Sequence, residues 1–438
     1  MIPINGKYTN AIIYTDNIEQ EAISQLYGLC NHPAFEGATI RVMPDVHAGA
    51  GCTIGTTVKL AKRMVIPNIV GVDIGCGVLT TIFKATTPID FKKLDDFIIE
   101  NIPSGMSVRN GKHSKLNDNV KKEIKEIVEN LNLGNLNYFI NSVGTLGGGN
   151  HYIEIGKIDD TTFALSVHTG SRNLGKKVCD HFQLRAQNNM KGGPALKDAI
   201  DKKIVELKKE HREKDINKEI MNLKNNFEGK ILGIPRGLEY IEDKDFDDYM
   251  CNMLKCQSMA AENRRLIATD IIKFLNVDVI EQFDTIHNYI EVTHECDEFA
   301  CRPVYYIRKG AISAKMGEKL AIPLNMRDGV IIGIGKGNED WNCSAPHGAG
   351  RLLSRSKAKE QVSLEEFEDA MSGIQTWSVC KDTIDESPQA YKPAEEIVEL
   401  VKDTIEIQYI VKPIYNYKAH TVEKTWKERK LEAKEKKE

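Results

Sequence analysis

Short apolar runs interrupted by glycine fill residues 37–83 and 141–175, and similar runs return late in the chain as CRPVYYIRKGAISA and GVIIGIGKG. Such runs are typical of strands joined by tight loops. Between the first two segments, residues 116–133 read LNDNVKKEIKEIVENLNL and place apolar side chains at helical spacing, which predicts a helix. Residues near 176–280 are also helical in pattern and rich in charge. The layout predicts an α+β fold with mixed β-sheets flanked by helices.

Length and composition exclude several classes of protein. A chain of 438 residues with 41% hydrophobic and 28% charged residues can bury a large core. The net charge of −4 argues against a general binder of polyanions. We find no signal peptide, and the most apolar run is broken by Pro67, Asn68 and Asp73, so no membrane span is expected. The ten cysteines lack the spacing of a disulfide framework, which favours a reducing cytoplasm.

Neither common phosphate-binding loop is present. No stretch supplies GxxxxGK[ST], and GAGCTIG at residues 49–55 places its last glycine one residue late for GxGxxG. Any nucleotide must therefore be held in another way.

The stretch VGVDIGCGV at residues 70–78 places Asp73 and Cys76 three positions apart among glycines. Histidines in similar glycine-rich or strand-like surroundings are His151, His168, His287 and His347, with His47 and His294 as weaker candidates. Carboxylate, thiolate and imidazole together suit Zn, Mn or Fe, and a thiolate can bridge two ions. For each histidine alone, the alternative is a structural residue satisfied by a neighbour.

Two of these histidines are followed closely by arginine. Arg172 comes four residues after His168, and Arg351 four residues after His347, with Ser or Gly between them. Guanidinium groups in such loops suit phosphate oxygens.

Seven segments, taken in order, resemble the landmarks of the RtcB family of RNA-splicing ligases. They are MPDVHAGAGCTIG, GVDIGCG, GTLGGGNHYIEI, VHTGSRNLG, RKGAISA, GNEDWNCSAPHGAGRLLSR and VKPIYNYK. The resemblance covers roughly residues 40 to 418. It implies an enzyme that uses GTP and two Mn(II) ions to join an RNA 3′-phosphate or 2′,3′-cyclic phosphate end to a 5′-hydroxyl end. It also implies a guanylylated histidine and an RNA 3′-guanylylated intermediate, in RNA repair or tRNA splicing.

The resemblance assigns roles by position. Asp73, Cys76, His151, His168 and His287 would be metal ligands, with Cys76 bridging, and His347 would be the nucleophile. Nucleotide contacts would come from Asn150, His151, Tyr152, Ile153, Glu154, His287, Asn288, Pro323, Leu324, Asn325, Met326, His347, Gly348, Ala349, Gly350 and Lys418. The candidates for RNA phosphates are Arg172, Lys309 and Arg351, although an exposed strand lysine is an equal alternative for Lys309.

The chain departs from the family pattern in two places. Residues 323–329 read PLNMRDG where the family usually has Pro-Gly-Ser-Met-Gly, so Leu324 and Asn325 replace small residues near the nucleotide. The chain also extends beyond Lys418. Because ligands from residues 73 to 347 must meet in one site, we expect one catalytic domain over residues 1–418. A charged helix or tail is expected over residues 419–438.

Two other functions remain open from the sequence. One is a metal-dependent phosphoesterase that acts on RNA cyclic phosphate ends, in which the altered loop has lost productive GTP binding. The other is a non-catalytic RNA-end binder. An activating protein is a further possible partner, and the sequence does not set the oligomeric state.

Overall fold

The computed structural model describes residues 1–190, 193–210, 212–226, 234–296 and 300–420. Its first large sheet has six strands in the order β1-β2-β3-β4-β12-β11, in which β2 and β3 are parallel and the other pairs antiparallel. The strands are β1 (Ile2–Asn5), β2 (Asn10–Ile13), β3 (Thr39–His47), β4 (Ile54–Leu60), β11 (Asn288–Cys296) and β12 (Cys301–Lys309).

The second large sheet is antiparallel throughout and has seven strands in the order β10-β6-β8-β7-β17-β15-β14. The strands are β6 (Gly77–Lys84), β7 (Tyr152–Lys157), β8 (Thr162–Thr169), β10 (Asp278–Ile286), β14 (Lys319–Pro323), β15 (Val330–Gly335) and β17 (Ile405–Tyr417). Two short pairs complete the strands: β5 (Met64–Val65) with β9 (Ile241–Glu242), and β13 (Ala311–Ser313) with β16 (Ser344–Pro346).

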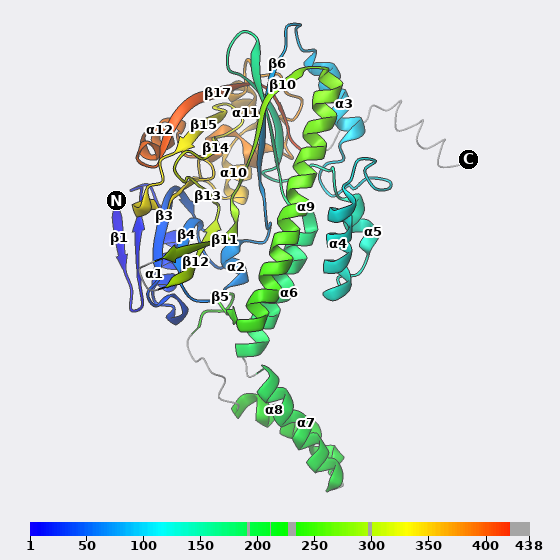
Figure 1. The fold of residues 1–438 in the computed structure, drawn as a ribbon, viewed down its shortest axis with the longest axis vertical. Coiled ribbons are helices and arrows are strands. Elements are labelled where there is room, and N and C mark those ends of the chain that lie inside the picture. The colour runs from blue at the N-terminus through cyan, green and yellow to red at the C-terminus, as the bar shows by residue number, and fades with distance from the viewer. Residues whose placement is uncertain (191–192, 211, 227–233, 297–299, 421–438) are drawn as a thin grey trace, which may run out of the picture.

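Helices flank both sheets. The described part of the chain contains α1 (Gln20–Cys30), α2 (Pro67–Val70), α3 (Phe91–Asn101), α4 (Asp118–Asn130), α5 (Leu136–Asn141), α6 (Arg172–Met190), α7 (Gly193–Lys209), α8 (Ile216–Asn226), α9 (Asp243–Leu275), α10 (Arg355–Gln361), α11 (Leu364–Ala370) and α12 (Ala394–Leu400). Figure 1 shows the long α9 running beside β6 and β10 with α3 at its C-terminal end, while α7 and α8 stand away from the rest.

The largest apolar core lies between the six-stranded sheet and the helices α1, α4, α6 and α9. A second core packs α3 and the C-terminal half of α9 against the seven-stranded sheet. The apolar stripe of α4 follows the predicted spacing, since Val120, Ile124, Ile127 and Val128 are its buried residues.

The α+β class and the helical region are confirmed, with α6 beginning at Arg172, slightly before the predicted start. Among the described residues, no helix is both long and apolar enough to cross a membrane. A disulfide joins Cys296 to Cys301 at the β11–β12 hairpin, which the cysteine spacing did not predict. Of the expected charged segment, residues 421–438 lie outside the described part of the chain.

Candidate active site

Four neighbouring strands of the seven-stranded sheet carry candidate ligands at one end. β6 begins directly after Cys76, and its antiparallel neighbour β10 ends directly before His287. On the other side of β6, His168 lies one residue before the end of β8, and β7 begins directly after His151. Strand register therefore gathers four segments that are far apart in the sequence at the same edge.

The loop that carries Asp73 and Cys76 joins α2 to β6. Gly71 and Gly75 adopt positive φ angles of 102° and 71°, a region that other residues rarely occupy. A Cβ on Gly75 would lie 2.9 Å from Gln257 Cα, so the loop lies directly against α9. The glycines thus permit a sharp loop that fits between strand and helix.

The buried Arg264 of α9 fixes this loop to the end of β8. Its Nη1 donates to the carbonyl oxygens of Gly75 and Thr169, both at 2.8 Å. Its Nε and Nη2 donate to the carboxylate of Asp284 at 2.7 and 2.6 Å. One fully buried cation therefore holds the residues that directly precede Cys76 and directly follow His168.

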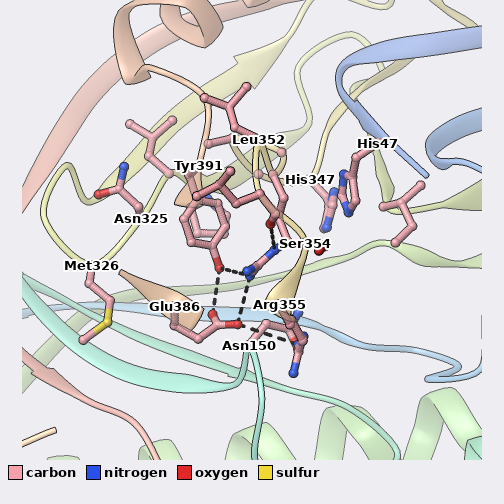
Figure 2. Close-up of a pocket in the computed structure, with 18 of the residues that line it drawn as sticks. His47, Asn150, Asn325, Met326, His347, Leu352, Ser354, Arg355, Glu386 and Tyr391 are labelled. Atoms are coloured by element: carbon pink, nitrogen blue, oxygen red, sulfur yellow. Dashed lines mark hydrogen bonds and ion pairs between the residues drawn. The ribbon is translucent and has the colours of Figure 1, made fainter. Parts of the chain in front are cut away.

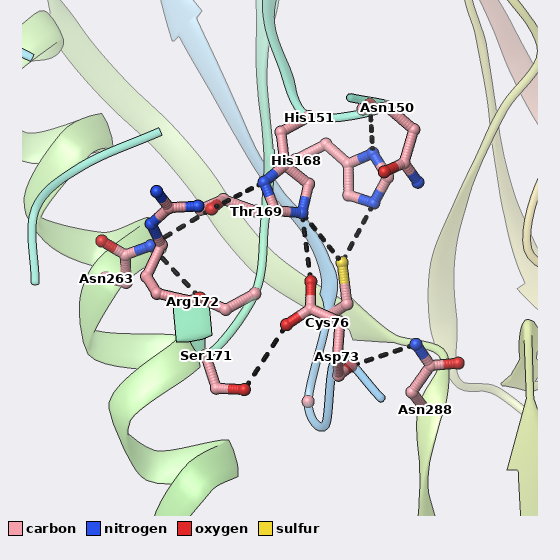
Figure 3. A network of polar contacts seen from close by, with 12 residues as sticks. Asp73, Cys76, Asn150, His151, His168, Thr169, Ser171, Arg172, Asn263 and Asn288 are labelled. Atoms are coloured by element: carbon pink, nitrogen blue, oxygen red, sulfur yellow. Dashed lines mark hydrogen bonds and ion pairs between the residues drawn. The ribbon is translucent and has the colours of Figure 1, made fainter. Parts of the chain in front are cut away.

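The candidate ligand atoms lie close together (Figure 3). Cys76 Sγ is 3.4 Å from His168 Nε2 and 3.6 Å from His151 Nε2, which is 3.1 Å from Asp73 Oδ2. The described residues include two groups that could hold a metal ion: Asp73 with Cys76 and His151, and Cys76 with His168 and His287. Cys76 belongs to both, which is the arrangement expected if a thiolate bridges two ions.

Backbone carbonyls orient two of the imidazoles. His151 Nδ1 lies 2.9 Å from the carbonyl oxygen of Leu146, and His168 Nδ1 lies 3.1 Å from that of Asn150. A hydrogen on each Nδ1 would satisfy these carbonyls and leave each Nε2 with a free lone pair, as metal-binding histidines require.

Electrostatics also fit a cation among these residues. Burial, reinforced by the neighbouring histidines, lowers the pKa of His168 and His287 well below its usual value, so both imidazoles are neutral. Burial and then the Asp73 charge raise the pKa of the Cys76 thiol well above its usual value. Burial alone would raise the pKa of Asp73. Its hydrogen bond with His151 and the charge of that histidine outweigh burial, so the pKa lies below its usual value. A thiolate here would need a nearby cation.

His347 follows β16 and lies outside both ligand groups. Its Nδ1 lies 2.6 Å from Asp45 Oδ2, which also accepts the backbone N–H groups of His347 and Gly348 at 3.0 and 3.2 Å. Asp45 is fully buried in β3. The carboxylate can accept a hydrogen bond from the Nδ1–H group and leave Nε2 with a free lone pair. The His347 ring lies 4.8 Å from the His287 ring, between centroids.

A cavity of about 680 Å³ opens beside His347. Its lining includes the predicted nucleotide-binding residues Asn150, Tyr152, Glu154, Pro323, Leu324, Asn325, Met326, His347, Gly348, Ala349, Gly350 and Lys418. The volume lies within the range of small-molecule sites. The two loops 323–326 and 347–350 therefore face one cavity.

A buried ion-pair cluster forms one wall of this cavity. Glu386 accepts from Lys418 Nζ at 2.9 Å, from the Tyr391 hydroxyl at 2.7 Å and from Arg351 Nη1 at 3.2 Å. Figure 2 shows Glu386 among Tyr391, Arg355 and Asn150. Burial raises the pKa of Glu386, but Lys418 and the two arginines outweigh burial and bring the pKa to about 2. Glu386 thus stays ionised and holds Lys418 at the cavity.

Glu154 supplies a second buried carboxyl group. It lies on β7, where burial raises its pKa to about 8 against the opposing effects of Asn416 and Lys418. Asn416 Nδ2 donates to Glu154 Oε2 at 2.9 Å. A buried carboxyl that lines the cavity can accept hydrogen bonds from N–H groups on the edge of a base.

Comparison with known proteins agrees with this geometry. The family model described as tRNA-splicing ligase RtcB matches residues 25–419. The chain belongs to the RtcB family. The RNA-splicing ligase RtcB of Escherichia coli K12 is 29% identical over 426 residues, which cover 91% of this chain and 94% of that protein. The tRNA-splicing ligase RtcB of Methanococcus maripaludis is 24% identical over 473 residues, covering 91% and 90% of the two chains.

The altered loop of this RtcB-family chain closes on itself. Asn325 Oδ1 accepts the backbone N–H groups of Arg327 and Asp328 at 3.0 and 2.9 Å, and Asn325 Nδ2 donates to Asp328 at 2.7 Å. Leu324 is 3% exposed. The loop therefore lines the cavity while its Asn325 side chain is engaged within the loop.

The three candidates for RNA phosphates occupy different surroundings. Arg172 donates to Thr145 Oγ1 at 3.0 Å and to the Gly105 carbonyl at 3.1 Å, beside the ligand cluster. Lys309 is only 6% exposed, because its Nζ donates to two backbone carbonyls, so the exposed alternative is wrong. Arg351 lines the cavity and holds Glu386.

Four predicted contact residues lie outside the cavity lining. They are His151 and His287, which belong to the two ligand groups, and Ile153 and Asn288. Ile153 is fully buried in the core beneath the seven-stranded sheet. Asn288 braces the ligand loop, since its Nδ2 donates to the Asp73 carbonyl at 3.0 Å. Sequence reasoning missed Asp45 and Glu386. Asp45 lies in the quoted MPDVH segment, so its acidic side chain at a glycine-rich strand end was the available signal.

Proposed function

We propose that this protein is an RNA ligase that joins RNA 3′-phosphate or 2′,3′-cyclic phosphate ends to 5′-hydroxyl ends with GTP. The observation that carries the proposal is the position of His347: its Nδ1 is held by Asp45, and it faces the cavity beside two ligand groups that share Cys76. A histidine nucleophile needs a free ring nitrogen and a nearby site for the reacting phosphate.

The donor set fits two Mn(II) ions, of which Asp73, Cys76 and His151 would hold one and Cys76, His168 and His287 would hold the other. When bound, such ions would neutralise phosphate charge and favour departure of pyrophosphate. The chain itself keeps His168 and His287 neutral and Asp73 ionised, and it holds His347 outside the ligand set.

The proposed first step is attack of His347 Nε2 on the α-phosphorus of GTP, which forms an N–P bond and releases pyrophosphate. The hydrogen stays on Nδ1, where Asp45 accepts its hydrogen bond and stabilises the positive charge that develops on the ring. An oxygen of the RNA 3′-phosphate then displaces His347 from phosphorus. In the last step, the 5′-hydroxyl attacks the RNA 3′-phosphate, loses its proton and releases GMP.

The buried carboxyl of Glu154 supports guanine as the base. Guanine carries N–H groups from which a carboxylate can accept hydrogen bonds. Lys418 also lines the cavity, and its ammonium group can donate to an oxygen of the base. This pairing of acceptor and donor is what supports GTP as the nucleotide.

The test is intact mass after incubation with Mn(II) and GTP in the absence of RNA, beside a His347→Ala variant with equal metal content. A guanylyl adduct that appears only on the wild type supports the proposal. Metal-loaded wild type without an adduct contradicts it.

The altered loop favours one alternative, a phosphoesterase that acts on cyclic phosphate ends. Asn325 is engaged within the loop and presents no free hydroxyl to a nucleotide, unlike the serine of the usual family pattern. Hydrolysis of a 2′,3′-cyclic phosphate by metal-loaded protein that never forms the adduct would identify this activity.

A further inference from the structure

A second cavity of about 570 Å³ lies between α3, the loop that follows it and the C-terminal end of α9. Figure 1 shows α3 beside this end of α9. The lining includes aromatic residues, three cationic side chains and two carboxylates, and shares no residue with the cavity beside His347.

The aromatic part is a stacked pair at the cavity wall. The rings of Phe97 on α3 and Phe274 on α9 lie 4.3 Å apart with an angle of 17° between their planes. Phe274 is 40% exposed, so part of its ring is open to solvent. A partly open ring stacked on a second ring is a platform on which a nucleobase can stack.

The cationic part consists of Arg109, Lys112 and Lys273. Arg109 Nε donates to the Gly144 carbonyl at 3.0 Å, whereas its Nη2 is buried without a hydrogen-bond partner and lies 3.7 Å from Asp270 Oδ2. That Asp270 oxygen is already 2.8 Å from His113 Nε2. Arg109 is therefore held against Gly144 and Asp270, and its guanidinium adds positive charge to the cavity wall.

The carboxylates do not cancel this charge. Of Glu100 and Asp270, the second is engaged by His113 and Arg109, and the lysines Lys112 and Lys273 are exposed. The cavity therefore combines a stacking surface with two exposed lysines and a guanidinium, as in sites for single-stranded nucleic acid.

The loop connects this cavity to the ligand cluster. The Gly105 carbonyl accepts from Arg172, and Gly105 N donates to the Gly147 carbonyl at 2.8 Å. Four residues later, Arg109 lines the second cavity. A chain of this length spans at most about 14 Å, so the two sites lie close enough for one RNA strand to reach both.

We propose that this second cavity is a subsite for the RNA strand next to the end being joined, with a base stacked on Phe274 and a phosphate held by Lys112 and Lys273. The inference rests on the proposed function, because the strand is that of the ligase substrate. It adds a surface that strengthens the binding of longer RNA strands and leaves the reaction at His347 unchanged.

The test compares Lys112→Gln/Lys273→Gln and Phe274→Ala with wild type. Binding of a 3′-phosphate trinucleotide and of a longer unstructured RNA is measured by anisotropy at several salt concentrations. The matched control is Lys214→Gln/Lys218→Gln, which removes two exposed lysines near and on α8, away from both cavities.

We expect the lysine variant to bind the longer RNA about tenfold more weakly and to lower the salt slope by about 0.7 for each lost phosphate contact. Phe274→Ala should weaken the same RNA by roughly 5- to 150-fold and leave the salt slope unchanged. The trinucleotide should bind all variants like wild type.

Adduct formation without RNA separates the two proposals. Variants that form the adduct normally and bind the longer RNA like wild type overturn the subsite, and this includes the case in which the cavity takes a protein partner. Metal-loaded wild type that forms no adduct and seals no RNA overturns the proposed function instead.

Discussion

Asp45→Asn is the sharpest test of the proposal that Asp45 prepares His347 for attack on GTP. Asp45 Oδ2 accepts three N–H groups, including His347 Nδ1 at 2.6 Å. Asparagine keeps the shape and an acceptor oxygen but removes the charge. Hydrogen bonds to charged groups contribute about 1.5–3 kcal/mol, so guanylylation should slow by roughly 10- to 150-fold. A misplaced ring hydrogen would extend the loss toward about 10⁴-fold, as in other histidine–aspartate pairs.

The assay is the rate of adduct formation under saturating Mn(II) and GTP, followed by intact mass. Metal content and thermal midpoint are measured on the same samples, and Asp160→Asn, at a side chain that is 97% exposed, is the surface control. Adduct formation at the wild-type rate would refute the reasoning. Loss of metal or of the fold would instead assign Asp45 a structural role.

Three further predictions follow from the site. Cys76→Ser should lower bound Mn(II) from two ions toward one or none, by elemental analysis, because both ligand groups use this sulfur; two retained ions would exclude bridging. The pKa of Glu154 is about 8, so its carboxyl group ionises as the pH rises from about 6 to 8. GTP affinity, measured by calorimetry, should rise up to tenfold per pH unit over this range and then level off, and Glu154→Gln should show no such rise. The pKa of Glu386 is lowered to about 2, so ionised Glu386 stabilises the fold above about pH 4.5 and this stabilisation is lost as the pH falls toward 2. Between these pH values the free energy of unfolding of Glu386→Gln, measured by acid unfolding, should fall by roughly 3 kcal/mol less than that of the wild type.

Local patterns predicted much of the fold. The α4 stripe buries the expected residues, and the glycine-broken runs became strands of both large sheets. Strand order was beyond reach, because β17 inserts between β7 and β15 from the far end of the chain. Such pairings depend on contacts that no local pattern records.

The candidate site shows the same limit at the level of single residues. Asp73, Cys76 and the three histidines could be named as candidate ligands because they lie in glycine-rich or strand-like segments that also resemble the family's motifs. Asp45 meets His347 across 302 positions, and Glu386 meets Lys418 across 32, so their pairing became visible only in the folded chain. An exposed Lys309 stayed open as an alternative because its strand gives no sign of the two backbone carbonyls to which its Nζ donates.

Arg264 has a consequence for how quickly the site can be loaded. It connects the carbonyls beside Cys76 and His168 through the hydrogen bonds of its own guanidinium. The two halves of the ligand set are therefore already in register when the chain has folded. Little ordering is left for the moment of metal capture, so uptake should be limited by access and by release of the thiol proton rather than by rearrangement of the backbone.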